Sequence, residues 1–385
     1  MRALIPWRWT AERWLTDRLG YQRRFSSSPL HRVLLISAPN ELCHTQLYPF
    51  LFHRKALRQT PGIELRELPL AAFRAGGHVF ARQRVDVVCV QTWFDLSDDD
   101  LRQLLEQVRT AFPEARIAYF DWFAPTDLRY AQAVDDSVAV YLKKQVFRDR
   151  SAYSQSTRGD TNLTDYFSCR YGLDLPETRF SIPAGFFSKL VLGPNFCFSA
   201  HMLPYFLGDF PESPKAFDVH ARIAVKGTEW YTRMRQEALD VVEGISGIRL
   251  VSRGRVPRSE YFKELFASKI CFSPFGYGEV CWRDYEAAFA GALLIKPNMD
   301  HIESRPDIFQ AHRTYVPVRW DLSDLEETVR YYLDHEDERI EIARCAFDTV
   351  KAYLEQNTFL DDMRPFWERL LPGDTASGGK SRSRS

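Results

Sequence analysis

Short runs of consecutive apolar residues, separated by longer amphipathic stretches, recur along the first half of the chain. These runs predict buried strands at residues 33–36, 63–68, 85–90, 116–120 and 138–142. Between them, Ser97 is placed to cap a helix that continues to Phe112, with aspartates in its first turn, where the helix dipole favours acidic groups. Strands that alternate with helices predict a parallel sheet covered by helices on both faces.

The same alternation returns in the second half, after a less periodic stretch that is rich in proline and glycine. Apolar runs predict further strands at residues 216–220, 248–251, 269–272, 292–295 and 314–318. Ser323 is predicted to cap the helix that follows, because Glu326 lies three residues further on. Residues 151–164 are polar and predict a mobile loop, and residues 210–214 predict an interdomain hinge.

A chain of 385 residues exceeds the usual size of one hydrophobic core, so two domains are expected. We predict an α/β protein in which two doubly wound, Rossmann-like domains face a cleft. The predicted segments are a basic helix at residues 1–30, a first domain at 31–212, a second domain at 216–355, a last helix at 356–371 and a low-complexity, disordered tail at 372–385.

The first 30 residues combine six arginines with two acidic residues, a net charge of +4. Trp7, Trp14 and Leu15 share one face if this segment is helical. One interpretation is a helix that lies on an anionic membrane surface through residues 1–25. The alternatives are a helix packed against the rest of the protein and a mitochondrial presequence, against which the two acidic residues count.

The overall composition argues against several other classes of partner. Lysine plus arginine equals aspartate plus glutamate at 51 each, so no overall field favours nucleic acid. No segment reaches the roughly 18 apolar residues of a membrane span. The seven cysteines are scattered without a Cys-x-x-Cys pair, which argues against zinc or a disulfide framework. A reducing, cytoplasmic location follows, with the basic helix as the means of any contact with the inner face of a membrane.

The stretch from Phe272 to Pro297 carries most of the candidate chemistry. It predicts a strand end, a Gly-x-Gly turn at Gly276 and Gly278, a helix over residues 282–290 and a further buried strand. That order is one crossover unit of a parallel sheet. Open α/β sheets bind ligands at such a turn, where a strand ends and a helix begins.

Cations and a carboxylate accompany this loop. Arg222 and Lys226 follow the first strand of the second domain, and Arg283 and Glu286 lie on the helix after the loop. Cations beside free backbone N–H groups suit a diphosphate, and a buried carboxylate suits ribose hydroxyls. In the simpler interpretation, Arg283 and Glu286 form a solvated i,i+3 ion pair worth roughly a few tenths of a kcal/mol.

The sequence FGYGEVCWRDYEAA at residues 275–288, followed by GALLIKP at 291–297, resembles the carboxy-terminal domain of group-1-type glycosyltransferases, most closely the CgeB-like branch. The resemblance covers residues 216–354. It implies a GT-B architecture, a nucleoside-diphosphate-sugar donor and transfer without a metal or other cofactor. It also implies that the helix at residues 356–371 crosses back to the first domain.

The resemblance assigns roles residue by residue. Glu286 resembles the second glutamate of the Glu-x7-Glu motif, which contacts the donor ribose, and Arg222 and Lys226 resemble the pair that neutralises the diphosphate. The predicted donor-binding residues are Arg222, Lys226, Gly276, Tyr277, Gly278, Arg283 and Glu286.

The first acid of that motif is out of register in this chain. The position eight before Glu286 is Gly278, and the nearest acid is Glu279, one residue later. Glu279 is therefore the candidate catalytic acid of the second domain. Retention and inversion of the sugar configuration both stay open.

An inverting enzyme needs a base in the first domain to deprotonate the acceptor. Asp121, at a strand's carboxyl end, is the best-placed candidate, with a loop anchor or helix cap as the alternative. Asn40 and His44 are predicted on the acceptor side. The run Asp98–Asp100 resembles a metal-binding motif of the other glycosyltransferase fold, but its place after Ser97 favours first-turn acids, so no metal site is predicted.

The sequence thus predicts an enzyme that moves a sugar from a nucleoside-diphosphate sugar to an unknown acceptor. The first alternative is a catalytically inactive nucleotide-sugar-binding or scaffold protein with the same fold. The second is a hinge-closing receptor for a small ligand. The sugar, the nucleotide base, the acceptor and the oligomeric state are not determined by the sequence.

Overall fold

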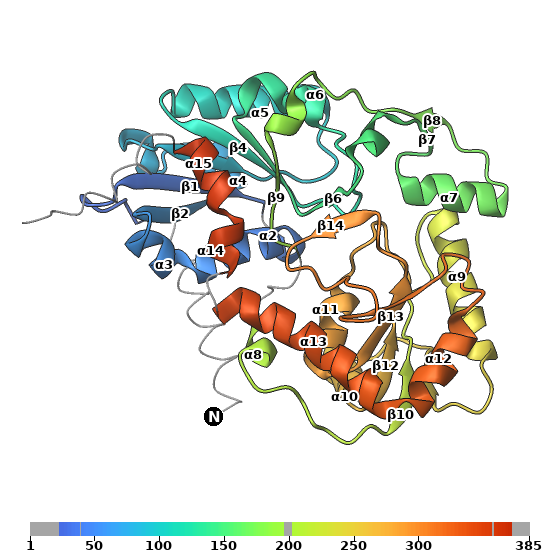
Figure 1. The fold of residues 1–385 in the computed structure, drawn as a ribbon. Helices are drawn as coiled ribbons and strands as arrows, with labels where there is room; N and C mark the ends of the chain where they lie inside the picture. Colours follow the sequence, from blue (N-terminus) through green and yellow to red (C-terminus); the bar gives the residue numbers. More distant parts are fainter. Residues whose placement is uncertain (1–22, 39, 196–201, 356–357, 372–385) are drawn as a thin grey trace, which may run out of the picture.

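Two α/β domains lie side by side in the computed structural model of the protein (Figure 1). The structure describes residues 23–38, 40–195, 202–355 and 358–371. The predicted basic helix therefore lies outside the described residues, apart from the extended stretch 23–30, and so does the predicted tail at 372–385.

The first sheet has six parallel strands in the order β2-β1-β3-β4-β5-β9. Its central strands are buried on both faces, which explains why their sequences are continuous apolar runs. The strands are β1 His31–Ser37, β2 Ile63–Pro69, β3 Val87–Val90, β4 Arg116–Asp121, β5 Val140–Lys143 and β9 Leu190–Leu192. The helices between them are α2 Glu41–Phe52, α3 Arg54–Gln59, α4 Leu70–Ala75, η2 Val79–Arg82, α5 Asp98–Ala111, α6 Ala131–Val134 and η3 Asp135–Ser137.

Helix α5 begins as the sequence predicts. The Ser97 side chain accepts a hydrogen bond from the backbone N–H of Asp100 at 3.1 Å, and Asp98 to Asp100 form the first turn. Arg102 pairs with Asp99 one turn further on. The three aspartates therefore have a local structural explanation as first-turn acids.

The stretch after β5 is more structured than the sequence predicts. The predicted loop at 151–164 contains most of a 3-10 helix, a short strand and the start of α7, where Thr161 and Thr164 form a capping box. Because short-range polar contacts stabilise these elements, their sequences lack the regular spacing of apolar residues from which helices and strands are predicted. The elements are β6 Gln145–Phe147, η4 Arg150–Ser154, β7 Thr157–Arg158, α7 Asn162–Tyr171, β8 Glu177–Thr178, η5 Phe186–Ser188 and α8 Leu203–Phe206.

The second sheet has five parallel strands in the order β11-β10-β12-β13-β15. In both sheets the first strand along the chain lies between the second and the third. The predicted α/β class is confirmed. The strands are β10 Phe217–His220, β11 Leu250–Val251, β12 Ser268–Phe272, β13 Leu293–Pro297 and β15 Val316–Val318. The helices are α9 Glu229–Gly244, α10 Arg258–Phe266, α11 Trp282–Ala290, α12 Leu325–Asp334 and α13 Glu336–Glu355.

The predicted cap at Ser323 is wrong by one residue. Helix α12 begins at Leu325, so the N-cap position belongs to Asp324. The Ser323 hydroxyl instead donates to Asp321 Oδ1 at 2.8 Å, in a turn before the helix. Such a turn competes with capping for the same serine side chain.

Several contacts join the domains. Strand β6 of the first domain pairs antiparallel with β14 (Ile302–Ser304) of the second. Helix α7 contacts α9. The last helices, α14 (Thr358–Asp362) and α15 (Arg364–Leu370), lie against the first domain (Figure 1), where the rings of Phe50 and Phe359 meet edge to face at 5.0 Å.

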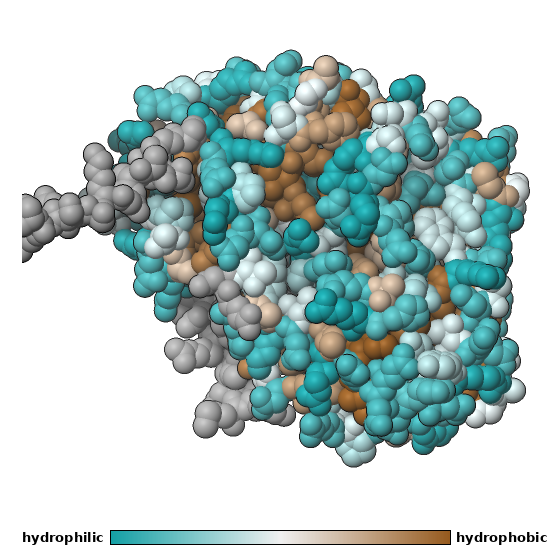
Figure 2. Space-filling view, viewed as in Figure 1, coloured by the Kyte–Doolittle hydropathy of each residue, from teal (hydrophilic) through white to brown (hydrophobic). Residues whose placement is uncertain are grey.

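Most of the face drawn in Figure 2 is hydrophilic, and apolar side chains gather beside β9 at the edge of the first sheet. Within the described residues, no helix combines the length and the apolar character that crossing a membrane requires.

Candidate functional site

The carboxyl ends of β10 and β12 bring the predicted donor-binding residues to one edge of the second sheet. Arg222 follows β10, and the loop at 276–279 follows β12 and leads into α11. Cys281 and Asp284 cap that helix reciprocally, and the Asp284 carboxylate is held by Ser273 Oγ at 2.6 Å and by Lys296 at 3.2 Å. The N-terminus of α11 is thereby fixed rigidly beside the loop.

Two neighbouring arginines face this edge. Arg235 of α9 is 6% exposed and donates from Nε to the carbonyl of Phe275 at 3.1 Å. Arg283 of α11 donates from Nη2 to the carbonyl of Arg222 at 2.7 Å, and its Nε has no hydrogen-bond partner in the described part of the chain. Burial, with the charge of Arg283 as the second cause, lowers the pKa of Arg235.

Neither Arg235 nor Arg283 lies within ion-pair distance of a carboxylate among the described residues, whereas half-buried Arg222 and Arg129 each pair with one. Two adjacent cations that are largely withdrawn from water and have no carboxylate partner are costly unless an anion binds between them. The pair is therefore the candidate anion site, next to the glycine loop and the α11 N-terminus. The sequence prediction included Arg283 and missed Arg235, which precedes the loop by 41 residues in the sequence.

His220, at the end of β10, is kept neutral mainly by its burial. It is fully buried, and neither ring nitrogen has a hydrogen-bond partner in the described residues. Burial, reinforced by the charges of Arg283 and Arg222, lowers the pKa of His220 to about 3. A protonated imidazole would be repelled by the positive charges of Arg283 and Arg222. A neutral His220 is therefore compatible with a site in which cations surround an anion.

The depressed pKa of His220 predicts a pH dependence of stability. In the unfolded chain the imidazole protonates near pH 6.5, whereas in the folded chain it resists protonation down to about pH 3. The stabilisation is therefore complete above pH 6.5 and is lost as pH falls towards 3. Between pH 7.5 and 5, we expect His220 to account for a loss of about 2 kcal/mol in the free energy of unfolding. Urea denaturation of wild type and His220→Gln measures this, and equal losses in both proteins would contradict it.

Glu286, on α11, is nearly buried and accepts a hydrogen bond from the Tyr261 hydroxyl at 2.7 Å. Burial raises the pKa of Glu286, although the Tyr261 bond and the charge of Arg283 oppose the shift. Its position, one helical turn after Arg283, keeps it beside the anion site. The predicted ribose contact requires such a carboxylate, and it stays a prediction.

Arg222 is engaged by other groups in this structure, and its role in donor binding stays a prediction. Its guanidinium forms a bidentate pair with Glu264, at 2.5 and 2.7 Å, and also donates to the carbonyl of Gly254 at 2.9 Å. These bonds use the donors that a diphosphate would need. Arg222 therefore braces the loop after β11 in this structure, and its main-chain carbonyl holds Arg283 in place.

The other predicted donor-binding residues surround the loop. Lys226 is exposed, and no described residue forms an ion pair with it. Tyr277 stacks on Tyr231 with the ring centroids 4.3 Å apart, and its hydroxyl accepts from the backbone N–H of Thr228 at 3.1 Å. A Cβ atom at Gly276 would lie 3.2 Å from Cys281 Sγ, so the turn is tight at that position.

Gly278 touches the first domain directly. A Cβ atom added there would lie 1.8 Å from the carbonyl oxygen of Ala124. No side chain fits at that distance, which gives a physical reason for glycine in place of the motif's glutamate. The loop after β12 thus meets the loop after β4 at the domain boundary.

Glu279 is buried at the same boundary. Its Oε2 accepts hydrogen bonds from Thr126 Oγ1 at 2.7 Å and from Gln145 Nε2 at 3.0 Å, both in the first domain. Its Oε1 lies 3.5 Å from His301 Nε2. Burial opposes ionisation, but nearby His301 and the Thr126 bond hold the pKa of Glu279 below its ordinary value. A carboxylate enclosed in this way cannot contact the sugar directly.

Asp121 is not placed to act as the predicted base. It is completely buried and pairs with Lys143 Nζ at 2.8 Å, while Tyr141 donates to it at 2.5 Å. Its second oxygen accepts from the backbone N–H of Phe123 at 2.9 Å. Both oxygens are therefore used inside the first domain, which corresponds to the loop-anchor alternative.

The two acceptor-side candidates also make local contacts. Asn40 caps α2, because its side chain accepts from the backbone N–H of Leu42 at 2.8 Å. His44, one turn into α2, is nearly buried and lies 3.1 Å from Glu67. Neither residue lines the cavity described next.

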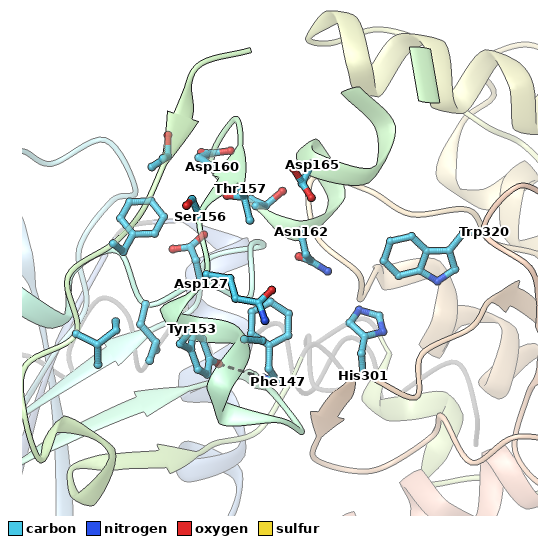
Figure 3. A pocket seen from close by; sticks show the side chains of 17 residues that line it. Asp127, Phe147, Tyr153, Ser156, Thr157, Asp160, Asn162, Asp165, His301 and Trp320 are labelled. Carbon is cyan, nitrogen blue, oxygen red and sulfur yellow. Dashed lines mark hydrogen bonds between the residues drawn. The ribbon is translucent and has the colours of Figure 1, made fainter. Parts of the chain in front are cut away.

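A cavity of about 370 Å³ opens where α7 and the short elements before it meet the second domain. His301 and Trp320 reach it from the second domain, and Asn162 points towards His301 from the start of α7 (Figure 3). Asp127, Asp160 and several aromatic rings complete the wall. Eight of the 17 lining residues come from the stretch at 151–164 that the sequence predicts as a mobile loop. In the described ranges, no group of three histidine, cysteine or acidic side chains is positioned to hold a metal ion.

Comparison with known proteins supports the carboxy-terminal assignment. Residues 211–361 match the family described as glycosyl transferase-like. The match begins before β10, extends into α14 and contains the candidate anion site. A comparison with curated proteins by sequence yields no match.

Three solved structures illustrate the likeness in fold. A glycosyltransferase from Rickettsia africae is 10% identical with a TM-score of 0.50, and the match covers 89% of this chain and 99% of that one. Anabaena HepE in complex with UDP-glucose is 9% identical with a TM-score of 0.44, covering 86% and 98%. S. aureus TarM is 7% identical with a TM-score of 0.44, covering 74% of this chain, which spans only 55% of TarM. The Rickettsia structure and the two parallel sheets establish the predicted GT-B architecture.

Proposed function

We propose that this GT-B chain, whose carboxy-terminal half is glycosyl transferase-like, is a glycosyltransferase that uses a nucleoside-diphosphate sugar. The observation that carries the proposal is the pair of neighbouring arginines, buried Arg235 and half-buried Arg283, neither of which has a carboxylate ion pair among the described residues. They lie beside a glycine loop and a capped helix N-terminus, which together form a site for a diphosphate.

In this proposal, each group has a defined task. Arg235 and Arg283 compensate the two charges of the diphosphate, and the α11 N-terminus adds its dipole. Glu286 accepts hydrogen bonds from the ribose hydroxyls, and Lys226, which is exposed after β10, is assigned to close over the phosphates. The arginines stabilise the leaving nucleoside diphosphate as the bond to the sugar breaks, a task that a divalent metal performs in other enzymes. Metal-independent transfer is accordingly part of the proposal.

Isothermal titration calorimetry with UDP-, GDP- and dTDP-sugars tests the donor assignment. We expect the wild-type chain to bind at least one of them. Arg283→Ala should weaken that binding by about 10- to 150-fold, since a hydrogen bond to a charged group is worth about 1.5–3 kcal/mol.

Arg233→Ala is the matched control for this titration. Arg233 lies two residues from Arg235 on the same helix, but it is exposed and pairs with Glu229. Its replacement should leave the affinity unchanged. If folded wild-type protein binds none of these donors, or if both variants lose affinity equally, the donor site is not where we place it.

The burial of both predicted catalytic acids favours one competing function, a nucleotide-sugar-binding protein without turnover. Asp121 and Glu279 are each completely enclosed. Release of free nucleoside diphosphate from a bound donor separates the two functions, because an inactive binding protein retains its donor intact. Turnover above the uncatalysed rate would exclude the binding-only function.

A further inference from the structure

The cavity at the domain boundary carries chemistry that differs from that of the anion site. Its rings include Phe147, Tyr153 and Phe180 of the first domain and Trp320 of the second. Between the rings lie amide and hydroxyl groups, among them that of Asn162. At about 370 Å³ it falls within the size range of small-molecule sites. Flat apolar rings combined with hydrogen-bonding groups favour a ligand with apolar faces and polar edges, as a sugar ring has.

The cavity is acidic. Asp127, Asp160 and Asp165 all line it. Asp127 forms a bidentate pair with Arg129, at 2.9 and 2.7 Å, and Asp160 shares the same guanidinium at 3.1 Å. Two of the three carboxylates thus share one guanidinium, which itself lies over the ring of Phe180 at 5.4 Å, and the described lining of the cavity contains no lysine or arginine. This excess of negative charge disfavours a phosphorylated or carboxylated ligand and suits a neutral or amino-bearing one.

A histidine and a carboxylate meet at the cavity wall. His301 lines the cavity with 29% of its side chain exposed, while Glu279 behind it is 1% exposed. Their Nε2 and Oε1 atoms are 3.5 Å apart, and Thr126 and Gln145 anchor the other carboxylate oxygen. An ionised carboxylate fixes the tautomer and the orientation of a neighbouring imidazole, and such contacts are often long before substrate binds.

We propose that this cavity binds the acceptor, a neutral or amino-bearing sugar, and that His301 removes the proton from its attacking hydroxyl while Glu279 positions the imidazole. The inference rests on the proposed function. His301 is the catalytic residue in it, and Glu279 is a positioning residue. The loop at 276–279 then links the two substrates, because Gly276 and Tyr277 face the donor and Glu279 faces the acceptor side.

The step balances without a further reactant. The acceptor O–H proton passes to the free imidazole nitrogen of His301 as the oxygen bonds to the anomeric carbon of the donor sugar. The bond from that carbon to the diphosphate oxygen breaks, and the nucleoside diphosphate leaves with the electron pair against the arginines. Direct displacement of this kind inverts the configuration at the anomeric carbon. Glu279 stabilises the imidazolium that forms.

Saturation-transfer NMR tests the acceptor class without knowledge of the natural acceptor. The probes are methyl glucoside, methyl N-acetylglucosaminide and methyl glucosaminide, with glucose 6-phosphate and methyl glucuronide as acidic probes. We expect signal from at least one neutral or amino probe and none from the acidic ones. Asp160→Asn should reduce the signal of the amino sugar, whereas Asp174→Asn, an exposed aspartate that does not line the cavity, should not. Preference for the acidic probes, or no binding by any probe, would overturn the acceptor assignment.

Kinetics of donor turnover test the base. With water as the acceptor, His301→Gln should lower kcat about 10²- to 10⁴-fold while the KM of the donor stays within twofold. Added imidazole should restore part of the activity of His301→Ala, which a purely structural role would not allow. Glu279→Gln should lower kcat less than His301→Gln does, and His335→Gln, at an exposed histidine, should change nothing.

The two proposals fail in different ways. If wild type binds a nucleotide sugar and turns it over, but His301→Gln is as fast as wild type, the base assignment falls and the donor site stands. If wild type binds no nucleotide sugar, the proposed function falls and the base assignment falls with it.

Discussion

Replacing Asp121 by alanine is expected to lower the free energy of unfolding by about 3–5 kcal/mol. The substitution leaves the ammonium of Lys143, which is 1% exposed, without its 2.8 Å partner inside the first sheet. It also removes the acceptor for Tyr141 and for the backbone N–H of Phe123. Uncompensated burial of a charge is among the few single changes that are this costly. Urea denaturation, followed by circular dichroism at constant m-value, measures the loss.

Two further variants separate the causes of this loss. Asp121→Asn with Lys143→Met removes both charges and keeps an acceptor for the neighbouring donors, so most of the stability should return. Asp99→Ala, which breaks the exposed pair with Arg102, should cost less than about 1 kcal/mol. If Asp121→Asn kept wild-type stability but abolished donor turnover, Asp121 would be a catalytic base after all.

The strands could be predicted because the parallel sheets bury them on both faces. Val33 to Ile36 and Val87 to Val90 have essentially no exposed surface, so their sequences contain no polar positions to confuse the pattern. Helix α5 could also be predicted, since its Ser97 cap and first-turn acids act within four residues. The stretch around η4 and α7 could not be predicted, because its structure is held by side-chain hydrogen bonds such as those of Thr161 and Thr164.

The residues of the candidate site also differ in whether a local sequence pattern shows them. The loop at 276–279, Arg283 and Glu286 were identified because they lie on one contiguous crossover unit. Arg235 and His301 were not, since tertiary packing alone brings them to that unit. The pairing of Arg222 with Glu264 could not be predicted for a related reason, because the two residues are 42 positions apart and no local pattern shows the pair.

Charge separates the two proposed substrates. Arg235 donates to Phe275, directly before the loop at 276–279, and Arg283 follows the loop on α11, whereas three aspartates line the cavity. A nucleoside diphosphate is attracted to the first region and repelled by the second. In this proposal, charge alone directs the donor to the arginines and the acceptor to the cavity, and the shapes of the two sites need not separate the two substrates.

Adding a side chain at position 278 is expected to damage both stability and turnover. In Gly278→Ala, the new Cβ must avoid the carbonyl oxygen of Ala124, which lies 1.8 Å from its ideal position. One backbone or the other has to move, and overpacking of this kind typically costs about 1–3 kcal/mol. The shift also pulls neighbouring Glu279 away from Thr126 and Gln145, so the imidazole of His301 loses its fixed partner. Thermal unfolding and donor turnover should therefore decline together.

The Gly278→Glu variant restores a glutamate eight residues before Glu286 and therefore tests the steric contact against the sequence motif. If the motif alone governed activity, this variant would be the better enzyme, but the contact with Ala124 predicts that it is less stable and less active than Gly278→Ala. Gly244→Ala is the control, since a Cβ there meets nothing within 4 Å, and its stability should match or slightly exceed wild type. Wild-type stability with increased turnover in Gly278→Glu would show that the domains work without this contact. It would then favour a retaining mechanism in which a glutamate at 278 faces the sugar, in place of the inverting one built on His301.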